Sequence, residues 1–114
     1  MVILTAIRYH ARMIVVTVLY PKNEQSRFDF DYYLEKHVPM VKARCEDFGL
    51  KEVRLMRGSA MVDGAPPQFE LIGELVFPSL KNLQDALGRH GAEIMADIPN
   101  YSNVQPMIQI SEAI

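Results

Sequence analysis

His37 is the side chain in this sequence with the clearest capacity for chemistry. It lies in the segment Phe28-Asp-Phe-Asp-Tyr-Tyr-Leu-Glu-Lys-His-Val-Pro39. Histidine ordinarily has a pKa of about 6.5, so its ring can take up or release a proton close to neutral pH. In a helix, His37 would lie on one stripe with the mostly apolar side chains of Phe30, Tyr33, Leu34 and Val41. A polar ring on that stripe must find a hydrogen-bond partner inside the fold or face a cavity.

Two interpretations of His37 follow from its neighbour Pro39. Proline lacks a backbone donor, so it should bend or interrupt the helix and free a carbonyl group. His37 is then either a proton-transfer group at a cavity or a core residue bonded to such a carbonyl. Tyr33, one turn earlier, has a similar pair of interpretations, because its hydroxyl could bind a ligand or its ring could simply pack in the core.

A second group of polar residues lies near the end of the chain. His90 shares the apolar stripe of a predicted second helix and precedes Gly91, so it is either a partner of His37 or a residue at a helix bend. Asp97, Asn100 and Tyr101 belong to a loop that either orders the mouth of a pocket or follows turn chemistry. For Asp97 the turn interpretation is favoured, because aspartate commonly bonds its own backbone.

Several kinds of chemistry lack support in the sequence. The three histidines and the carboxylates show no paired spacing of metal ligands. No glycine-rich turn follows the first predicted strand, and no serine lies in a nucleophile elbow. Cys45 is the only cysteine, which excludes an intramolecular disulfide and favours a buried structural thiol. We therefore expect neither a metal nor a bound cofactor.

Composition limits the class of protein. The chain has 114 residues, of which 49% are hydrophobic and 23% charged, as is typical of one globular domain. A net charge of −2 gives no reason to expect nucleic acid or an anionic membrane as a partner. No apolar run approaches the roughly 20 residues that span a bilayer. The single cysteine fits a reducing cytoplasm. We expect an N-terminal extension over residues 1–12 and a domain over residues 13–114.

Hydrophobic periodicity and turn residues predict the elements that must position these side chains. Four strands are expected over residues 14–20, 50–61, 69–77 and 104–111. A first helix should begin at the N-cap Asp29, bend at Pro39 and end at Gly49, and a second should begin at Ser79 and end at a loop over residues 97–101. This order predicts an α+β, ferredoxin-like βαββαβ fold with an antiparallel sheet.

The first predicted strand is apolar on both faces. Ile14, Val16 and Val18 alternate with Val15 and Leu19. If both helices cover one face of the sheet, the other face should be polar unless something else covers it. The simplest cover is a second copy of the same sheet, so we expect a homodimer in which the two sheets pack into an α+β barrel.

Three motifs give the sequence a family resemblance. The first is Phe28-Asp-x-x-Tyr-Tyr-x-x-x-His-x-Pro39, the second is His90-Gly-x-Glu-Ile-Met-x-Asp-Ile-Pro-Asn-Tyr101, and the third is Pro106-x-Ile-Gln-Ile110. Together they resemble the EthD family of dimeric α+β barrel proteins, over a span from Met13 to about Ile110.

The resemblance implies a role in the catabolism of small organic compounds, often beside a haem monooxygenase system, and the label oxidoreductase or reductase. Related barrels act as cofactor-free monooxygenases, cyclases, isomerases and decarboxylases, and several use a histidine in an apolar pocket, which His37 matches. The leading hypothesis is that the protein binds a small apolar or aromatic metabolite, to which His37 transfers a proton while Tyr33, His90, Asn100 and Tyr101 contact it. The alternatives are a non-catalytic ligand-binding or accessory module for an oxygenase system, and a cofactor-free monooxygenase.

Overall fold

The computed structural model describes residues 12–114, so the predicted extension over residues 1–12 lies, apart from Arg12, outside the described residues. The four strands form one antiparallel sheet in the order β2-β3-β1-β4. This arrangement confirms the predicted ferredoxin-like α+β fold. The elements are β1 (Ile14–Pro21), α2 (Phe30–Tyr32), a π-helical turn (Tyr33–His37), α3 (Val38–Cys45), a 3-10 turn (Glu46–Phe48), β2 (Glu52–Arg57), β3 (Phe69–Phe77), α4 (Leu80–Asp97), a second 3-10 turn (Ile98–Asn100) and β4 (Met107–Glu112).

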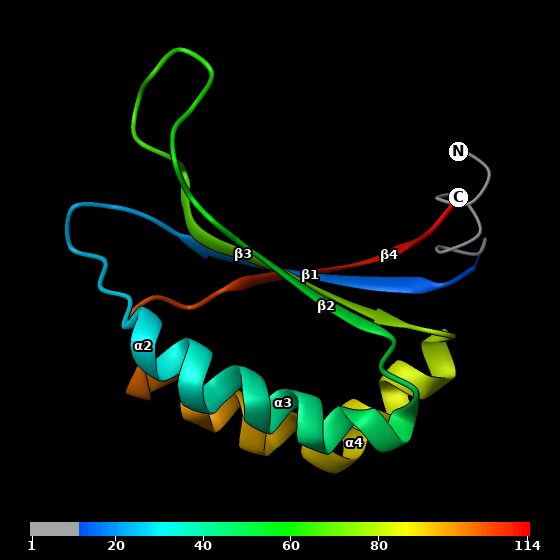
Figure 1. The fold of residues 1–114 in the computed structure, drawn as a ribbon. Helices are drawn as coiled ribbons and strands as arrows, with labels where there is room; N and C mark the ends of the chain where they lie inside the picture. Colours follow the sequence, from blue (N-terminus) through cyan, green and yellow to red (C-terminus); the bar gives the residue numbers. More distant parts are fainter. Residues whose placement is uncertain (1–11) are drawn as a thin grey trace.

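Both helical segments lie against the same face of the sheet (Figure 1). Alternate residues of the two central strands therefore point at the helices and form the core. One buried cluster joins strand residues such as Val16 and Phe77 to Val41 of α3 and Leu83 of α4. A second cluster, which contains Tyr20, Tyr33 and Tyr101, lies at the other end of the helices. The polar residues of interest belong to that aromatic end.

Local structure confirms the two predicted N-caps and the end of the first helical segment. The carboxylate of Asp29 accepts a bond from the backbone N–H of Tyr32 at 3.0 Å, and the hydroxyl of Ser79 accepts one from Asn82 at 3.1 Å. Both are N-cap bonds, in which a side-chain oxygen accepts from a backbone N–H group of the first turn that has no partner within the helix. The first helical segment ends at Gly49, whose φ of +83° lies in the left-handed region that favours glycine.

The interruption expected near Pro39 is present as a π-helical turn over Tyr33–His37. In this turn the backbone N–H of Val38 donates to the carbonyl of Tyr33, five residues back. The wider turn ends two residues before Pro39, which has no backbone N–H to donate. Such π turns are frequent at functional sites, and this one contains both Tyr33 and His37.

Several element boundaries differ from the sequence-based expectation. The second strand spans Glu52–Arg57 rather than residues 50–61, and its last pair on β3 is Arg57 with Leu71. The last strand begins at Met107, immediately after Pro106. The second helix includes Asp97 and continues into a 3-10 turn, where a loop is expected from the sequence. None of the helices in residues 12–114 combines the length and apolar character needed to cross a membrane.

Candidate functional site

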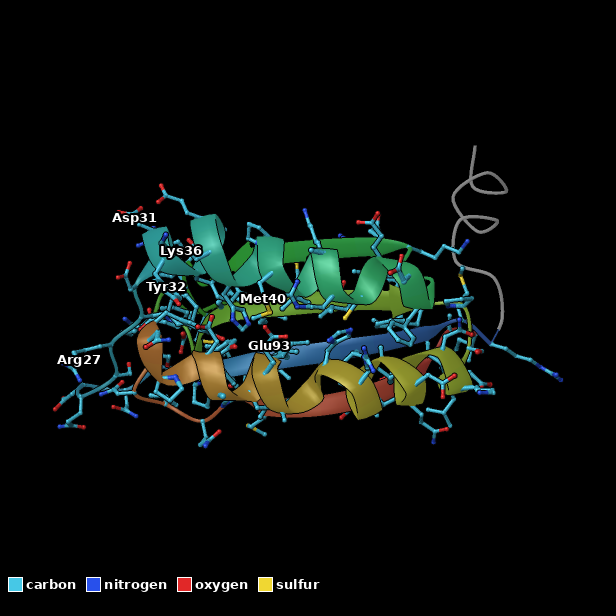
Figure 2. The ribbon with its side chains drawn as sticks, turned by 90° about the horizontal axis from the view of Figure 1, so that it is seen from below. Arg27, Asp31, Tyr32, Lys36, Met40 and Glu93 are labelled. Carbon is cyan, nitrogen blue, oxygen red and sulfur yellow. The ribbon has the colours of Figure 1, made fainter. Side chains whose placement is uncertain are left out.

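The two helical segments run side by side in opposite directions, so the start of one lies beside the end of the other. Figure 2 shows Tyr32, at the beginning of the first segment, next to the C-terminal end of α4. The exposed pair of Arg44 and Glu93, at 2.9 Å, links the same two segments farther along. This antiparallel packing brings Asp97, the last residue of α4, to the ring of His37.

His37 is 5% exposed and uses both ring nitrogens. Its Nδ1 lies 2.9 Å from Oδ2 of Asp97, and its Nε2 lies 3.2 Å from the hydroxyl of Tyr101. An ionised carboxylate can only accept hydrogen bonds, so Nδ1 carries a proton that it donates to Asp97. In the neutral ring, Nε2 is then the acceptor, and the Tyr101 hydroxyl donates to it. Among the described residues, the structure does not contain the alternative bond from His37 to a backbone carbonyl freed by Pro39.

Asp97 is held on its other oxygen by two further side chains. Its Oδ1 accepts hydrogen bonds from the Tyr32 hydroxyl at 2.7 Å and from the Asn100 amide at 2.9 Å. Burial alone would raise the pKa of the Asp97 carboxyl, but the bonds from Tyr32, Asn100 and His37 together hold that pKa below its ordinary value. The turn interpretation favoured for Asp97 is therefore wrong, because its carboxylate bonds three side chains.

Beyond His37 the hydrogen bonds continue into the sheet. The hydroxyl of Tyr101 lies 2.5 Å from the hydroxyl of Tyr20, the inward-facing residue near the end of β1. Burial raises the pKa of both phenols, so both stay protonated and neutral. The result is a chain of four side chains, Asp97–His37–Tyr101–Tyr20, which we call the relay. Such a chain can pass a proton by reorienting its hydroxyl groups.

Tyr33 packs beside the relay without joining it. Its ring stacks on the His37 ring with centroids 5.5 Å apart and planes 19° apart, a geometry that the π-helical turn sets. Tyr33 is 5% exposed, and its hydroxyl has no hydrogen-bond partner among residues 12–114. A Cβ atom on Gly73 of β3 would lie 3.4 Å from this hydroxyl. The glycine therefore leaves open space beside Tyr33.

A cavity of about 310 Å³ lies between the sheet and the helices. This is at the lower end of the range of small-molecule sites. His37, Tyr33 and Tyr20 contribute its polar groups, and the rest of the wall is almost entirely aliphatic or aromatic. Four wall residues on α4 and β4 are nearly half-exposed, so the cavity opens at that edge of the molecule: Leu87, Met95, Ile108 and Ile110.

The structure brings together some of the residues singled out in the sequence and not others. Tyr33 and His37 line the cavity. Tyr101 and Asn100 do not, and they bond to His37 and to Asp97 respectively. His90 is not brought to His37. Its ring lies at the edge of the Phe48 ring, with centroids 5.8 Å apart, and its Nδ1 is 3.9 Å from Glu93.

Sequence reasoning did not single out Tyr20 or Tyr32. Tyr20 has the same strand parity as Ile14, Val16 and Val18, so the alternation of β1 could have placed it on the inner face. Nothing in the sequence indicates that the Tyr32 hydroxyl reaches Asp97, 65 residues later. No group of three or more histidine, cysteine, aspartate or glutamate side chains within the described residues is arranged to hold a metal ion.

The fold and the site define a class of protein, a ferredoxin-like α+β domain with an apolar cavity and a buried histidine at its wall. A solved EthD-like protein from Ralstonia eutropha JMP134 has the same fold with a TM-score of 0.83 and 40% identity, and the match covers 92% of this chain and 95% of that one. The chain therefore belongs to the EthD-like proteins. No protein-family model and no curated protein matches the sequence.

More distant structures show the fold alone. An EthD family protein from Bacillus halodurans C-125 has a TM-score of 0.65 at 22% identity, over 90% of this chain and 99% of that one. A putative antibiotic biosynthesis monooxygenase from Bordetella bronchiseptica has a TM-score of 0.58 at 11% identity, over 92% and 99% of the two chains. The ferredoxin-like fold is thus shared with monooxygenase-type proteins.

Proposed function

We propose that this EthD-like protein binds a small apolar or aromatic metabolite in its cavity and transfers a proton to or from it through His37, without a cofactor. The observation that carries this proposal is the 2.9 Å contact between Asp97 and His37 at the wall of an apolar cavity. A carboxylate on Nδ1 fixes the tautomer in which Nε2 can accept a proton. It also stabilises the imidazolium that forms when the proton arrives.

Proton uptake by His37 requires the relay to reorient. Nε2 accepts from Tyr101 in the neutral ring, so a proton gained at Nε2 turns this nitrogen into a donor to the same hydroxyl. Tyr101 then donates to Tyr20, which lies 2.5 Å away and also lines the cavity. No heavy atom has to move far, and the surrounding apolar wall excludes water that would compete for the proton.

Deuterium exchange tests this function with a panel of compounds in place of the natural substrate. Small neutral carbon acids are incubated with the protein in D₂O, and incorporation is followed by NMR. We expect His37→Gln and Asp97→Asn to lose most of the incorporation that the unmodified protein catalyses. Glu35→Gln, on the exposed side of the same helical turn, is the matched control and should behave like the unmodified protein. Equal rates in the His37→Gln variant would remove His37 from the mechanism.

A second candidate is a non-catalytic binding or accessory module for an oxygenase system. The observation that favours it is that both ring nitrogens of His37 already have partners inside the protein. A satisfied histidine can serve stability alone. If that is its role, His37→Gln should lower the midpoint of unfolding and leave ligand affinity unchanged. The acid–base proposal instead predicts that His37→Gln loses turnover and largely keeps ligand binding.

We further propose that the protein is a cytoplasmic homodimer closed by its outer sheet face, the face opposite the helices. Apolar side chains on this face support the pairing. Val15, Leu19 and Ile72 are only half-buried there, and Met107 is 58% exposed. Light scattering at micromolar concentration tests the oligomeric state.

A further inference from the structure

The Tyr33 hydroxyl is a polar group that the proposed mechanism does not use. The residue is 5% exposed, and this hydroxyl has no hydrogen-bond partner in the part of the chain that the structure describes. Every fully buried side-chain nitrogen and oxygen of the described residues has a partner. The Tyr33 hydroxyl must therefore reach open space, and the open space beside it is the cavity, whose wall includes both Tyr33 and Gly73.

The other polar groups of the cavity wall lie close to Tyr33. The ring of Tyr20 lies 6.1 Å from that of Tyr33, and the ring of His37 lies 5.5 Å from it. The remainder of the wall is apolar, from Leu75 and Phe77 of β3 to Leu83 and Ile94 of α4. No aspartate, glutamate, lysine or arginine of the described residues lines the cavity. The cavity thus has one polar end and an uncharged apolar body.

We propose that the cavity selects neutral carbonyl compounds with an apolar body, and that the Tyr33 hydroxyl donates the hydrogen bond that holds the carbonyl oxygen. A phenol is a better donor than acceptor, and a carbonyl oxygen can only accept. A carboxylate or phosphate would lose its hydration in this cavity without gaining a cationic partner. Nδ1 of His37 is already paired with the Asp97 carboxylate. Burial raises the pKa of the Tyr33 phenol, so the donor keeps its proton at neutral pH.

This inference rests on the proposed function, because it gives His37 a substrate on which to act. With the oxygen held by Tyr33, the carbon next to the carbonyl lies at the polar end of the cavity. A C–H bond of that carbon breaks, and its electron pair moves onto the carbonyl oxygen. Its proton goes to the Tyr20 hydroxyl, which passes its own proton to Tyr101 as Tyr101 passes one to Nε2 of His37. The Tyr33 hydroxyl stabilises the charge that develops there. Return of the proton to the same or another carbon completes exchange or isomerisation without an oxidant.

Three probes of nearly equal size test the selection, namely acetophenone, ethylbenzene and benzoate, whose dissociation constants are measured by NMR titration. We expect acetophenone to bind the unmodified protein at least about tenfold more tightly than benzoate, because the charge cannot be buried unpaired. Tyr33→Phe should weaken acetophenone about fivefold to tenfold and leave ethylbenzene unchanged, since one neutral hydrogen bond is lost. Leu34→Ala, at the exposed position next to Tyr33 that does not line the cavity, is the control.

The outcomes separate this inference from the proposed function. If acetophenone does not bind, if benzoate binds equally well, or if Tyr33→Phe leaves the ratio of ketone to hydrocarbon affinity unchanged, the inference is overturned. Circular dichroism checks that the variant is folded. Deuterium incorporation into the methyl group of acetophenone is measured in parallel. Binding that depends on Tyr33 without catalysed incorporation would contradict the acid–base function and leave the carbonyl selection standing.

Discussion

Asp97 holds the imidazole of His37 across 60 residues of sequence, with 2.9 Å between Oδ2 and Nδ1. The contact exists because the first helical segment starts where α4 ends (Figure 2). Tyr32 and Asn100 fix the carboxylate from its other side. Asp97 thus positions His37 and sets its tautomer, and most of the consequences that can be tested begin from this pair.

Asp97 should make part of the stability depend on pH. The pKa of its carboxyl is lower in the folded protein than its ordinary value of about 3.9. Such a group contributes its full stabilisation above the ordinary pKa and loses it as pH falls through the lower, folded value. Asp97→Asn should therefore unfold more easily than the unmodified protein at pH 7, by about 1–2 kcal/mol. The difference should shrink below pH 4, as measured by urea unfolding across that range. A difference that stays constant with pH would contradict the assignment.

Tyr101 and Tyr20 should be energetically coupled. Tyr101→Phe removes the hydroxyl between them and leaves both Nε2 of His37 and the Tyr20 hydroxyl without that partner. We expect a loss of about 1–3 kcal/mol in the free energy of unfolding. Tyr20→Phe should cost less in the Tyr101→Phe background than in the unmodified protein, by at least about 0.5 kcal/mol. Additive losses in the double-mutant cycle would show that the two hydroxyls act independently.

Gly73 should control access to the Tyr33 hydroxyl. A methyl group there would lie 3.4 Å from that hydroxyl and 3.5 Å from Leu55, which is ordinary contact, so Gly73→Ala should fold with stability within about 1 kcal/mol of the unmodified protein. Because the methyl group fills the space beside the donor, affinity for acetophenone should fall. Gly88→Ala, at an exposed helical position with nothing near its added Cβ, is the control. An unchanged acetophenone affinity in Gly73→Ala would place the ligand elsewhere.

The parts of this molecule that depend on local sequence could be predicted. The β3 bounds follow from an apolar run between turn residues, and the caps at Asp29 and Ser79 follow from their side-chain chemistry. Pro39 predicts an interruption of the helix but not its form as a π-helical turn, because a missing donor does not specify the substitute geometry.

Contacts between distant segments could not be read from residue spacing. His37 is a candidate because a polar ring stands on an apolar stripe, yet its partners Asp97 and Tyr101 come from the other end of the chain. Its place on the apolar stripe of the second helix makes His90 an equally good candidate. The rotation of α4 instead turns this ring toward Phe48 and Glu93, and helical periodicity does not determine that rotation.

The outer sheet face should determine the oligomeric state. Ile72 of the central strand β3 is on this face, between its neighbours Leu19 of β1 and Met56 of β2. In a sheet-to-sheet dimer a charge introduced there would lose its hydration, and the cation on the same face, Arg54, is already paired with Glu74. We expect the unmodified protein to be a dimer at micromolar concentration by light scattering and Ile72→Glu to be a folded monomer. Val62→Glu, at a fully exposed position in the loop between β2 and β3, should remain dimeric. If the unmodified protein is a monomer, or if Ile72→Glu stays dimeric, the outer face is not the interface.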